Sequence, residues 1–417
     1  MEVAIAGMGP AGVNVVKTLR NNGFDGNITM FSVEKIPPYS PPALGEYLIT
    51  GNEAVLFWEG KDFCDKYDVA CRAGEKIVQI LPEEKMLKTE NGDAVKFDYL
   101  VIATGTKLYA PVKGSDKKGI FDFKTFVGTD KIKKMAKTGQ EKTAIIVGGG
   151  FIGVEIALSL ARIGIKSSVL NRRGWIMPRL IDPETAAYVE NDLRAQGVDV
   201  LLNTEGNEFV GGERVEGLLT TDGRKLKADI YITATGVKPS MDLVQNTGIE
   251  YDKGIIVNEY LQTKHPYIYA CGDVAETIER VSGERKIHGL FPVAVDHAQT
   301  VAFNILGLKK KYEKQVNMNS LKKLSYKLVV VGKLEGEELK HKTKDVLRKI
   351  FLKDDKIVGF VLLKDISNAG VYLSLFSKGI NVKPYKDELL SRHFYPGCFM
   401  SRILPRPNMS VSNFNNG

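Results

Sequence analysis

Residues 3–12 read VAIAGMGPAG: a short apolar strand, a glycine-rich loop and the first residues of a helix that begins near Pro10. Glycine in such a turn lets the backbone approach a pyrophosphate, whose charge is stabilised by the N–H groups and dipole at the helix N-terminus. The order strand, loop, helix distinguishes a phosphate-binding loop from an ordinary glycine turn. We therefore expect this loop to bind a dinucleotide through Gly7, Gly9, Pro10, Ala11 and Gly12.

The same pattern occurs again about 140 residues later. Residues 144–153 read AIIVGGGFIG, and a helix is expected to continue through Glu155 to Arg162. Two such loops in the same setting imply two dinucleotides, which suggests a nicotinamide in one site and a flavin in the other. The residues expected to bind in the second loop are Gly148, Gly150, Phe151, Ile152 and Gly153.

Length and composition predict several domains in a chain without a membrane span. The chain has 417 residues, of which 43% are hydrophobic, enough to bury large cores. Because the first strand starts at the N-terminus with no secretory signal before it, we expect a cytoplasmic protein. The longest apolar stretch, residues 144–161, contains four glycines and Glu155. It therefore indicates a buried strand followed by a helix rather than a membrane helix.

Three further segments connect the two loops to a known family. Residues 263–273 read TKHPYIYACGD, residues 99–105 read YLVIATG, and residues 231–236 repeat the latter as YITATG. Together with the loops, they resemble the pyridine nucleotide-disulfide oxidoreductase superfamily of FAD proteins. The resemblance extends by motif from Met1 to about residue 310 and more loosely to about residue 385.

The resemblance implies cofactors and contacts. In that superfamily the first loop holds FAD and the second holds NADPH or NADH. The Asp of the family's Tyr-Ala-x-Gly-Asp segment bonds the flavin ribityl chain, which implies this role for Asp273. An acidic residue after the second strand bonds the adenosine ribose. Glu34, 22 residues after Gly12, is at the expected distance. The resemblance also implies cofactor contacts at Thr104, Gly105 and Gly236.

The expected fold class is α/β, with two interleaved Rossmann-like dinucleotide-binding domains of three layers (ββα) and a small α+β C-terminal interface domain. We expect a hairpin over residues 77–97 that turns at Asn91-Gly92. We also expect a helix over 292–306, C-terminal strands at 326–331, 347–353 and 357–363, and a helix near 368–377. The predicted domains are an FAD-binding domain (1–106 and 239–315), an NAD(P)H-binding domain (107–238), an interface domain (316–392) and an irregular tail (393–417).

Charge near the second strand of the nicotinamide domain favours NADPH. NAD-specific relatives end this strand in a Glu that bonds the ribose and repels a 2′-phosphate. Here the strand 167–170 is followed by Asn171, Arg172 and Arg173, so a bidentate cation replaces the carboxylate. The run resembles the His-Arg-Arg of thioredoxin reductases, which use NADPH. The alternative is a solvated loop in which Asn171 bonds the ribose of NADH.

The segment expected beside the flavin lacks a thiol. Disulfide-reducing members of the superfamily carry a redox Cys in a segment like Tyr-Ser-Pro-Cys-Ala-Leu-Pro-Tyr. Residues 38–47 here read PYSPPALGEY, with Pro42 in the Cys position. Because proline has no thiolate, a thiol mechanism at this place is excluded.

The same segment is similar to the Pro-Tyr-x-Arg-Pro-x-Leu-Ser-Lys of rubredoxin, putidaredoxin and ferredoxin reductases, which pass electrons singly to iron-sulfur proteins. It departs from them with Pro41 for the Arg and Glu46 for the Lys. In those reductases the Lys pairs with a Glu that matches Glu155. Glu46 opposite Glu155 predicts two carboxylates near the flavin, one holding a proton at neutral pH. The alternative is that Glu46 points into solvent. We assign the redox site to Pro42, Glu46 and Glu155.

The cysteines and histidines predict no metal site. Cys64, Cys71, Cys271 and Cys398 form no CxxC pair, so the chain is expected to ligate no iron-sulfur cluster or zinc. Cys64 and Cys71 are expected to be ordinary structural or surface thiols. In this superfamily the helix near Pro292 points at the flavin, and His288 and His297 are expected either to border that pocket or to lie at the surface.

The basic excess of the chain is concentrated near its C-terminal module. Residues 309–356 contain 15 Lys and Arg against 7 Asp and Glu, an excess equal to the net charge of +8 for the whole chain. Such a region can steer an acidic electron carrier. No nucleic-acid-binding motif accompanies the lysines, so a nucleic-acid partner is not expected. The alternative is a solvated basic surface.

These observations predict an FAD-dependent NAD(P)H oxidoreductase that exchanges electrons with an iron-sulfur protein, as a free reductase or as the flavin subunit of a larger iron-sulfur complex. One alternative is a flavoenzyme that reduces oxygen, a polysulfide or a quinone. Another is a redox-responsive binding protein that resembles apoptosis-inducing factor. The C-terminal module resembles one that often builds homodimers.

Overall fold

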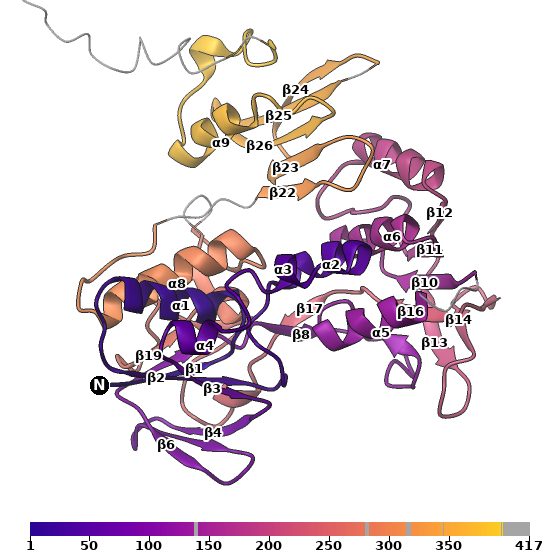
Figure 1. The fold of residues 1–417 in the computed structure, drawn as a ribbon. Coiled ribbons are helices and arrows are strands. Elements are labelled where there is room, and N and C mark those ends of the chain that lie inside the picture. Colours follow the sequence, from indigo (N-terminus) through magenta and orange to yellow (C-terminus); the bar gives the residue numbers. More distant parts are fainter. Residues whose placement is uncertain (137–140, 280–282, 314–317, 345, 393, 395–417) are drawn as a thin grey trace, which may run out of the picture. The chain divides into compact units, whose positions relative to one another are not determined.

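The computed structural model describes residues 1–136, 141–279, 283–313, 318–344, 346–392 and 394. These residues form two compact units (Figure 1). The first contains residues 1–179 and 183–315, and the second contains residues 180–182 together with the chain from residue 316.

The first sheet of the larger unit is parallel and is built from two distant parts of the chain. Its order is β19-β7-β1-β2-β3, so a strand near residue 270 extends a sheet that begins at residue 2. Strands β19, β7, β1 and β2 are largely buried and apolar, as expected for a parallel sheet covered on both faces, whereas the edge strand β3 is exposed or half-buried. They are β1 (Glu2–Ala6), β2 (Asn27–Ser32), β3 (Ala70–Ala73), β7 (Tyr99–Ile102) and β19 (Ile268–Ala270).

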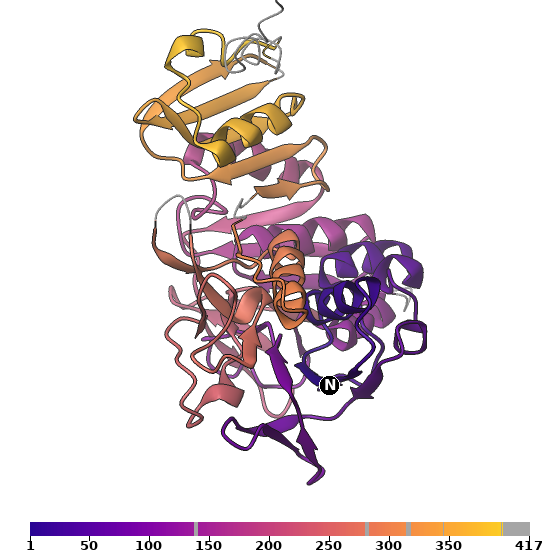
Figure 2. The ribbon, with the colours of Figure 1, turned by 90° about the vertical axis from the view of Figure 1, so that its left-hand side faces the viewer.

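Helices cover one face of this sheet and a small antiparallel sheet covers the other (Figure 1). Helices α1 (Pro10–Asn21) and α8 (Phe291–Ile305) lie side by side in both views (Figures 1 and 2) and contact each other along their lengths. The opposite layer consists of β4 (Ile77–Leu81), β5 (Met86–Thr89) and β6 (Ala94–Lys96). The layering is the expected ββα arrangement.

The expected single hairpin over residues 77–97 is a three-stranded meander. The turn at Asn91-Gly92 forms as predicted, with Gly92 at φ +90°. A second turn, closed by the Lys85 N–H donating to the Pro82 carbonyl at 2.9 Å, was not predicted. Its sequence, PEEK, contains no glycine, and Lys85 itself takes the left-handed conformation (φ +48°) that usually identifies a turn glycine.

The second sheet of the larger unit repeats the parallel pattern in the order β12-β11-β10-β16-β9. Its strands are β9 (Ile120–Phe121), β10 (Thr143–Val147), β11 (Lys166–Asn171), β12 (Val198–Leu202) and β16 (Ile230–Thr233). Its helices are α5 (Phe126–Ala136), α6 (Phe151–Arg162) and α7 (Pro183–Ala195). An antiparallel meander contains β13 (Gly206–Val210), β14 (Gly217–Thr220) and β15 (Lys225–Leu226).

The chain passes between these two sheets twice, and the two passages pair. Strands β8 (Thr106–Leu108) and β17 (Val237–Pro239) form a two-stranded antiparallel ribbon. The remaining elements of this unit are short: α2 (Leu44–Thr50), α3 (Glu53–Leu56), α4 (Phe63–Lys66), β18 (Ile255–Ile256), β20 (Ala275–Ile278), β21 (Arg285–Ile287), and the 3₁₀ turns η1 (Pro41–Ala43), η2 (Asp242–Val244) and η3 (Gly272–Val274).

The smaller unit is an antiparallel sheet in the order β22-β23-β26-β25-β24 with helix α9 (Ala369–Lys378) packed on β26. Its strands are β22 (Met318–Leu321), β23 (Leu328–Gly332), β24 (Glu337–Lys342), β25 (Leu347–Lys353) and β26 (Lys356–Leu363), followed by the 3₁₀ turn η4 (Lys383–Tyr385). Phe394 packs in its core, stacked on Tyr372 at 6.2 Å. The rest of the predicted tail, with Cys398, lies outside the described residues. The α/β class is confirmed.

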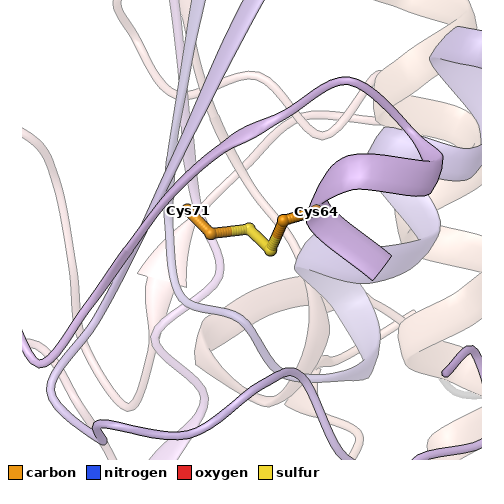
Figure 3. Close-up of a disulfide and its surroundings, with 2 residues drawn as sticks. All are labelled: Cys64 and Cys71. Atoms are coloured by element: carbon orange, nitrogen blue, oxygen red, sulfur yellow. A yellow bond between two sulfur atoms is a disulfide. The ribbon is translucent and has the colours of Figure 1, made fainter. Parts of the chain in front are cut away.

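The prediction that Cys64 and Cys71 are separate thiols is wrong, because the two residues form a disulfide (Figure 3). Helix α4 ends beside strand β3, which brings the two Cα atoms to 6.0 Å although no metal or CxxC motif marks the pair. Disulfides persist mainly in oxidising compartments and in intracellular proteins of hyperthermophiles. The bond therefore gives no support to the cytoplasmic expectation, which stays a prediction.

None of the helices in the described part of the chain has the length and hydropathy needed to cross a membrane.

Candidate functional site

The first glycine loop joins β1 to α1 and has the geometry of a phosphate cradle. Gly7 has φ +125°, and a Cβ on it would overlap the carbonyl oxygen of Ala103. A Cβ on Gly12 would overlap the carbonyl oxygen of Gly7, so helix and turn touch through glycine. At Gly9, by contrast, a Cβ would meet nothing within 4 Å. The first and third glycines are therefore needed by the fold, whereas the second leaves space for a ligand.

The second loop, between β10 and α6, repeats this geometry residue for residue. Gly148 has φ +119° and a Cβ on it would overlap the Ala234 carbonyl oxygen, while a Cβ on Gly153 would overlap that of Gly148. Gly150 again faces open space. In both loops, 141 positions apart, the middle glycine faces open space beside the first turn of a helix, so the residues present fit two pyrophosphates.

Both helices begin without a side-chain cap. Gly9 and Gly150 are the N-cap residues, neither helix has an acidic residue in its first turn, and each helix has 12 residues. The first N–H groups of α1 and α6 therefore lack the side-chain acceptor that caps most helices. The positive end of each helix dipole is left for an anion, as the sequence predicted for Pro10 and Ala11 in one loop and for Phe151 and Ile152 in the other.

The two carboxylates that the resemblance assigns to the flavin lie around one lysine. Glu34 follows β2 and Asp273 lies in η3, and both carboxylates interact electrostatically with Lys124. Burial raises the pKa of Glu34 and of Asp273, and Lys124 opposes both shifts. Burial lowers the pKa of Lys124, whereas the charges of Asp273, Asp122 and Glu34 raise it. Two carboxylates and a cation within electrostatic range of one another suit a ligand that carries both hydroxyls and a pyrophosphate.

Sequence reasoning missed Lys124. It precedes α5, in a turn that Asp122 holds by accepting hydrogen bonds from the N–H groups of Lys124 (3.0 Å) and Thr125 (2.7 Å). The chain has 58 Lys and Arg, and no motif distinguishes this one. Only the parallel pairing of β9 with β16, which positions the turn, could have indicated it.

We expect Lys124→Met to weaken FAD binding by about tenfold or more, the loss expected when one charge-assisted contact is removed. Titration of the apoprotein with FAD, followed by quenching of flavin fluorescence, measures the dissociation constant. Lys131→Met is the matched control, because Lys131 is exposed on the same segment, within α5. Equal affinities of the two variants would show that Lys124 does not contact the flavin nucleotide.

A buried histidine holds the turn that carries Asp273. The Gly272 N–H donates to His297 Nδ1 at 3.2 Å, and a Cβ on Gly272 would lie 3.0 Å from the Cβ of Ala11 in the first glycine loop. The His297 ring packs edge-on against Tyr312 with centroids 4.4 Å apart. Burial, followed by the charge of His288, lowers the pKa of His297 to about 3. His297 is therefore neutral and positions Asp273.

The expectation of a surface location for His288 and His297 is wrong, because both are buried. His297 lies on the face of α8 that packs against η3 and α1, where a buried polar ring is retained by its bond to the backbone.

Thr104, Gly105 and Gly236 lie at the two passages between the sheets. The Thr104 hydroxyl donates to the Ser240 carbonyl at 2.9 Å, and the Ser240 N–H donates to the Gly105 carbonyl at 2.9 Å. The Tyr109 N–H donates to the Gly236 carbonyl at 2.9 Å. These residues tie the chain passages together, and their predicted cofactor contacts stay predictions.

The loop after β11 folds back over the second glycine loop. The Met177 N–H donates to the Gly149 carbonyl at 2.7 Å, and the Asn171 amide donates to the carbonyls of Arg173 (3.2 Å) and Trp175. Asn171 is buried and its amide N–H groups serve this loop, so a ribose hydroxyl would have to donate to its Oδ1. The alternative in which Asn171 bonds the ribose of NADH stays a prediction. Arg172 and Arg173 are exposed, and Arg172 Nη1 lies 3.7 Å from Glu205 Oε1.

The predicted redox residues lie on neighbouring helices. Pro42 is exposed in η1, directly before α2, and α2 packs against α6. Glu46 is exposed on α2, as in the alternative that was left open, and Glu155 is half-buried on α6. The helices are brought together, but the shared proton between Glu46 and Glu155 stays a prediction.

The described cysteines offer no reactive thiol. Cys64 and Cys71 are bonded to each other, and burial raises the pKa of the Cys271 thiol to about 12. Cys271 is therefore protonated at neutral pH and a poor nucleophile. Among the described residues no group of three or more His, Cys, Asp or Glu could hold a metal ion.

Comparison with known proteins identifies the class that this fold and these two loops define. Residues 1–298 match the family model described as pyridine nucleotide-disulphide oxidoreductase, and the chain belongs to that family. Its cofactors are FAD and NADH or NADPH, as the two glycine loops predicted. The resemblance seen in the sequence is thereby confirmed.

Particular relatives agree with this class. The chain is 31% identical over 399 residues to "Nitrite reductase [NAD(P)H]" of Bacillus subtilis, covering 91% of this chain and 48% of that protein. It is 30% identical over 327 residues to an NADH oxidase of Methanocaldococcus jannaschii, covering 76% and 72%. The reductase of a covalent putidaredoxin reductase–putidaredoxin complex has the same fold, with a TM-score of 0.85 at 23% identity and coverage of 92% and 94%.

The chain spans about half the length of the first curated relatives it matches, the Bacillus subtilis nitrite reductase and an assimilatory nitrate reductase electron transfer subunit from the same organism.

Proposed function

We propose that this protein is an FAD-dependent NAD(P)H oxidoreductase that exchanges electrons with an iron-sulfur protein of the ferredoxin or rubredoxin type, alone or as the flavin subunit of a larger iron-sulfur complex. One observation carries the proposal: Pro42 occupies the position of the family's redox Cys, and no described thiol replaces it. Electrons must then leave the flavin without a disulfide relay.

The chain's own residues bind and orient the cofactors. The free space at Gly9 and Gly150 takes the two pyrophosphates, with the first N–H groups of α1 and α6 as donors. Glu34, Lys124 and Asp273 hold the flavin nucleotide, and His297 fixes the turn of Asp273. When bound, the flavin supplies the redox chemistry, accepting two electrons from the nicotinamide and passing them on.

Named relatives support an iron-sulfur partner. A ferredoxin–NAD(+) reductase subunit of a benzene 1,2-dioxygenase system and a rubredoxin–NAD(+) reductase, both from Pseudomonas putida, are 28% and 27% identical over 336 and 311 residues. The chain covers 81% and 80% of them. The match to half of two longer proteins supports the second form of the proposal, in which further electron-carrying parts adjoin this module.

Charge supports the same partner class. Residues 309–356 contain 15 Lys and Arg but only 7 Asp and Glu. This positive charge would attract an acidic carrier and raise its association rate. A cytoplasmic location and a homodimer formed through the C-terminal module belong to the same proposal.

Alkylation tests the absence of a thiol relay. We expect the enzyme, reduced with NADPH or NADH and treated with iodoacetamide, to keep its rate of carrier reduction, because no described thiol reacts at neutral pH. Mass spectrometry verifies alkylation of accessible cysteines. A loss of carrier reduction in proportion to labelling would assign a catalytic role to a thiol, Cys398 included, and would contradict the proposal.

Steady-state turnover with different acceptors tests the proposal itself. Under argon, oxidised ferredoxin and rubredoxin are supplied separately with NADPH or NADH, and reduction of the carrier is followed by its absorbance. Turnover with one carrier that exceeds turnover with quinone or polysulfide supports the iron-sulfur assignment. Turnover with the small acceptors alone would overturn it.

A second candidate function is reduction of a small acceptor such as oxygen. The relative named NADH oxidase, of which the chain covers 72%, favours it. Rapid turnover in air without any carrier protein would distinguish this function from the first.

A further inference from the structure

We propose that Glu205 is a specificity-determining residue. From the loop after β12 it supplies the carboxylate that is missing from the end of β11. By pairing with Arg172 it sets the relative affinity for NADPH and NADH. The proposal rests on the nucleotide-binding role of the second glycine loop. It concerns only the adenosine end of the nucleotide and is independent of the electron acceptor.

The position of Glu205 follows from the sheet. Strands β10, β11 and β12 are parallel neighbours, and Asn171, the last residue of β11, is in register with Leu202, the last residue of β12. The loops after these strands therefore meet at one edge of the sheet, beside the glycine loop after β10. In this fold the pyrophosphate lies at that loop and the adenosine ribose at the end of the next strand. Arg172 and Glu205 are thus both placed at the ribose end.

Backbone hydrogen bonds fix the two loops to each other. The Thr204 N–H donates to the Asn171 carbonyl at 3.0 Å, and the Asn203 N–H donates to the Arg173 carbonyl at 3.3 Å. The two residues that flank Arg172 are therefore both bonded to the loop that carries Glu205, directly before Glu205. The backbone bonds bring the two loops together, and Arg172 Nη1 lies 3.7 Å from Glu205 Oε1.

The pair is exposed, which lets a ligand replace one partner. The side chains of Arg172 and Glu205 are 63% and 51% exposed, and an ion pair of this kind contributes little to stability. A 2′-phosphate can therefore replace Glu205 as the partner of Arg172 with a small loss of free energy, and the guanidinium can bind it in a bidentate manner. The Glu205 carboxylate left beside the phosphate repels it, whereas the same carboxylate can accept hydrogen bonds from the free ribose hydroxyls of NADH.

A second arginine near Glu205, Arg224, is already paired with another carboxylate. Arg224 donates to the Asp222 carboxylate and, at 3.1 Å, to the Thr204 hydroxyl next to Glu205. Its position supports the loop of Glu205, and its charge is neutralised by Asp222. Glu205 pairs with Arg172, so exchange of that partner is the step on which the choice of nucleotide depends.

Calorimetric titration of the FAD-loaded enzyme with 2′,5′-ADP and with 5′-AMP tests the proposal without turnover, because the two probes differ by the 2′-phosphate and carry no nicotinamide. We expect Glu205→Gln to tighten 2′,5′-ADP binding by about fivefold to tenfold and to leave 5′-AMP binding unchanged or weaker. Arg172→Gln should weaken 2′,5′-ADP by about tenfold or more with little effect on 5′-AMP. In the Arg172→Gln background, Glu205→Gln should change the affinity for 2′,5′-ADP by a smaller factor than it does in the unmodified enzyme.

Glu213→Gln is the matched control. Glu213 is an exposed carboxylate of the same domain that pairs with Lys118, so its replacement removes the same charge away from the two loops. A Glu205→Gln effect equal to that of Glu213→Gln, or equal for both probes, would overturn the proposal. Failure of either probe to bind the unmodified enzyme would overturn it as well. Failure of carrier reduction with the probe affinities as expected would contradict the proposed function and leave Glu205 assigned.

Discussion

Gly9→Ala should give a folded protein that has lost its flavin. A Cβ at Gly9 meets no protein atom within 4 Å, so the apoprotein tolerates it, but the methyl group occupies the space left for the first pyrophosphate. Crowding of this kind costs about 1–3 kcal/mol, which corresponds to roughly 5- to 150-fold weaker binding of FAD. The flavin content after purification and the dissociation constant of added FAD measure the effect.

Gly150→Ala, the equivalent change in the second loop, should give the opposite phenotype. It should retain FAD and lose affinity for NADPH and NADH by a similar factor, because its Cβ enters the other free space. Gly370→Ala in α9 is the control, since its Cβ also meets nothing within 4 Å but lies in the smaller unit. Loss of flavin from Gly150→Ala with retention in Gly9→Ala would reverse the assignment of the two loops.

Acid should destabilise the enzyme through His297, and His297→Gln should remove this sensitivity. Burial lowers the pKa of folded His297 to about 3, against about 6.5 in the unfolded chain. Below pH 6.5 the unfolded chain therefore binds a proton that the folded protein does not, so stability falls as the pH decreases towards 3. The loss is about 1.4 kcal/mol per pH unit, or roughly 2–3 kcal/mol between pH 6.5 and 4.5.

Urea unfolding in a fixed excess of FAD, at several pH values over this range, measures the free energy of unfolding for both proteins. Glutamine can accept a hydrogen bond from the Gly272 N–H through its side-chain oxygen and does not titrate. The free energy of unfolding of the variant should therefore change with pH less steeply, by the amount that one bound proton contributes. Any stability cost of the substitution itself is the same at every pH. Parallel pH profiles of the two proteins would contradict the assignment of a neutral, buried His297.

The sequence predicted the parts of the site that depend on local backbone geometry. Gly7 and Gly148 adopt positive φ, and Gly12 and Gly153 lie in close contact with backbone. The spacing of these glycines therefore predicts the backbone conformation of both loops. The strand, turn and helix around each loop are contiguous in the chain. The fold class followed from the same segments, because two such units of buried parallel strands require the α/β arrangement.

The rest of the site depends on contacts between distant segments. Lys124 comes within electrostatic range of Glu34 and Asp273 only after β9 has paired with β16. His297 contacts Gly272 only after α8 has packed on α1. These side chains belong to no motif, so spacing could not identify them. Their function comes from burial, which changes their pKa values and excludes water from their hydrogen bonds.

The disulfide and the nucleotide loop show the same limit. Cys64 and Cys71 are seven residues apart, but only the placement of α4 beside β3 brings them into bonding distance. The run Asn171-Arg172-Arg173 suggested how a phosphate is held, yet its balancing carboxylate, Glu205, comes from the loop after the next strand. Sequence reasoning that examined the end of β11 alone could see the cation and not its partner.

One stopped-flow measurement separates electron transfer to an iron-sulfur protein from the alternatives. The enzyme is reduced anaerobically with NADPH or NADH and then mixed with oxidised ferredoxin, oxidised rubredoxin or air-saturated buffer, while flavin absorbance is recorded. We expect reoxidation by one of the carriers at a rate that rises with carrier concentration and far exceeds the rate in air. Reoxidation by oxygen alone, with neither carrier effective, would contradict the proposed function.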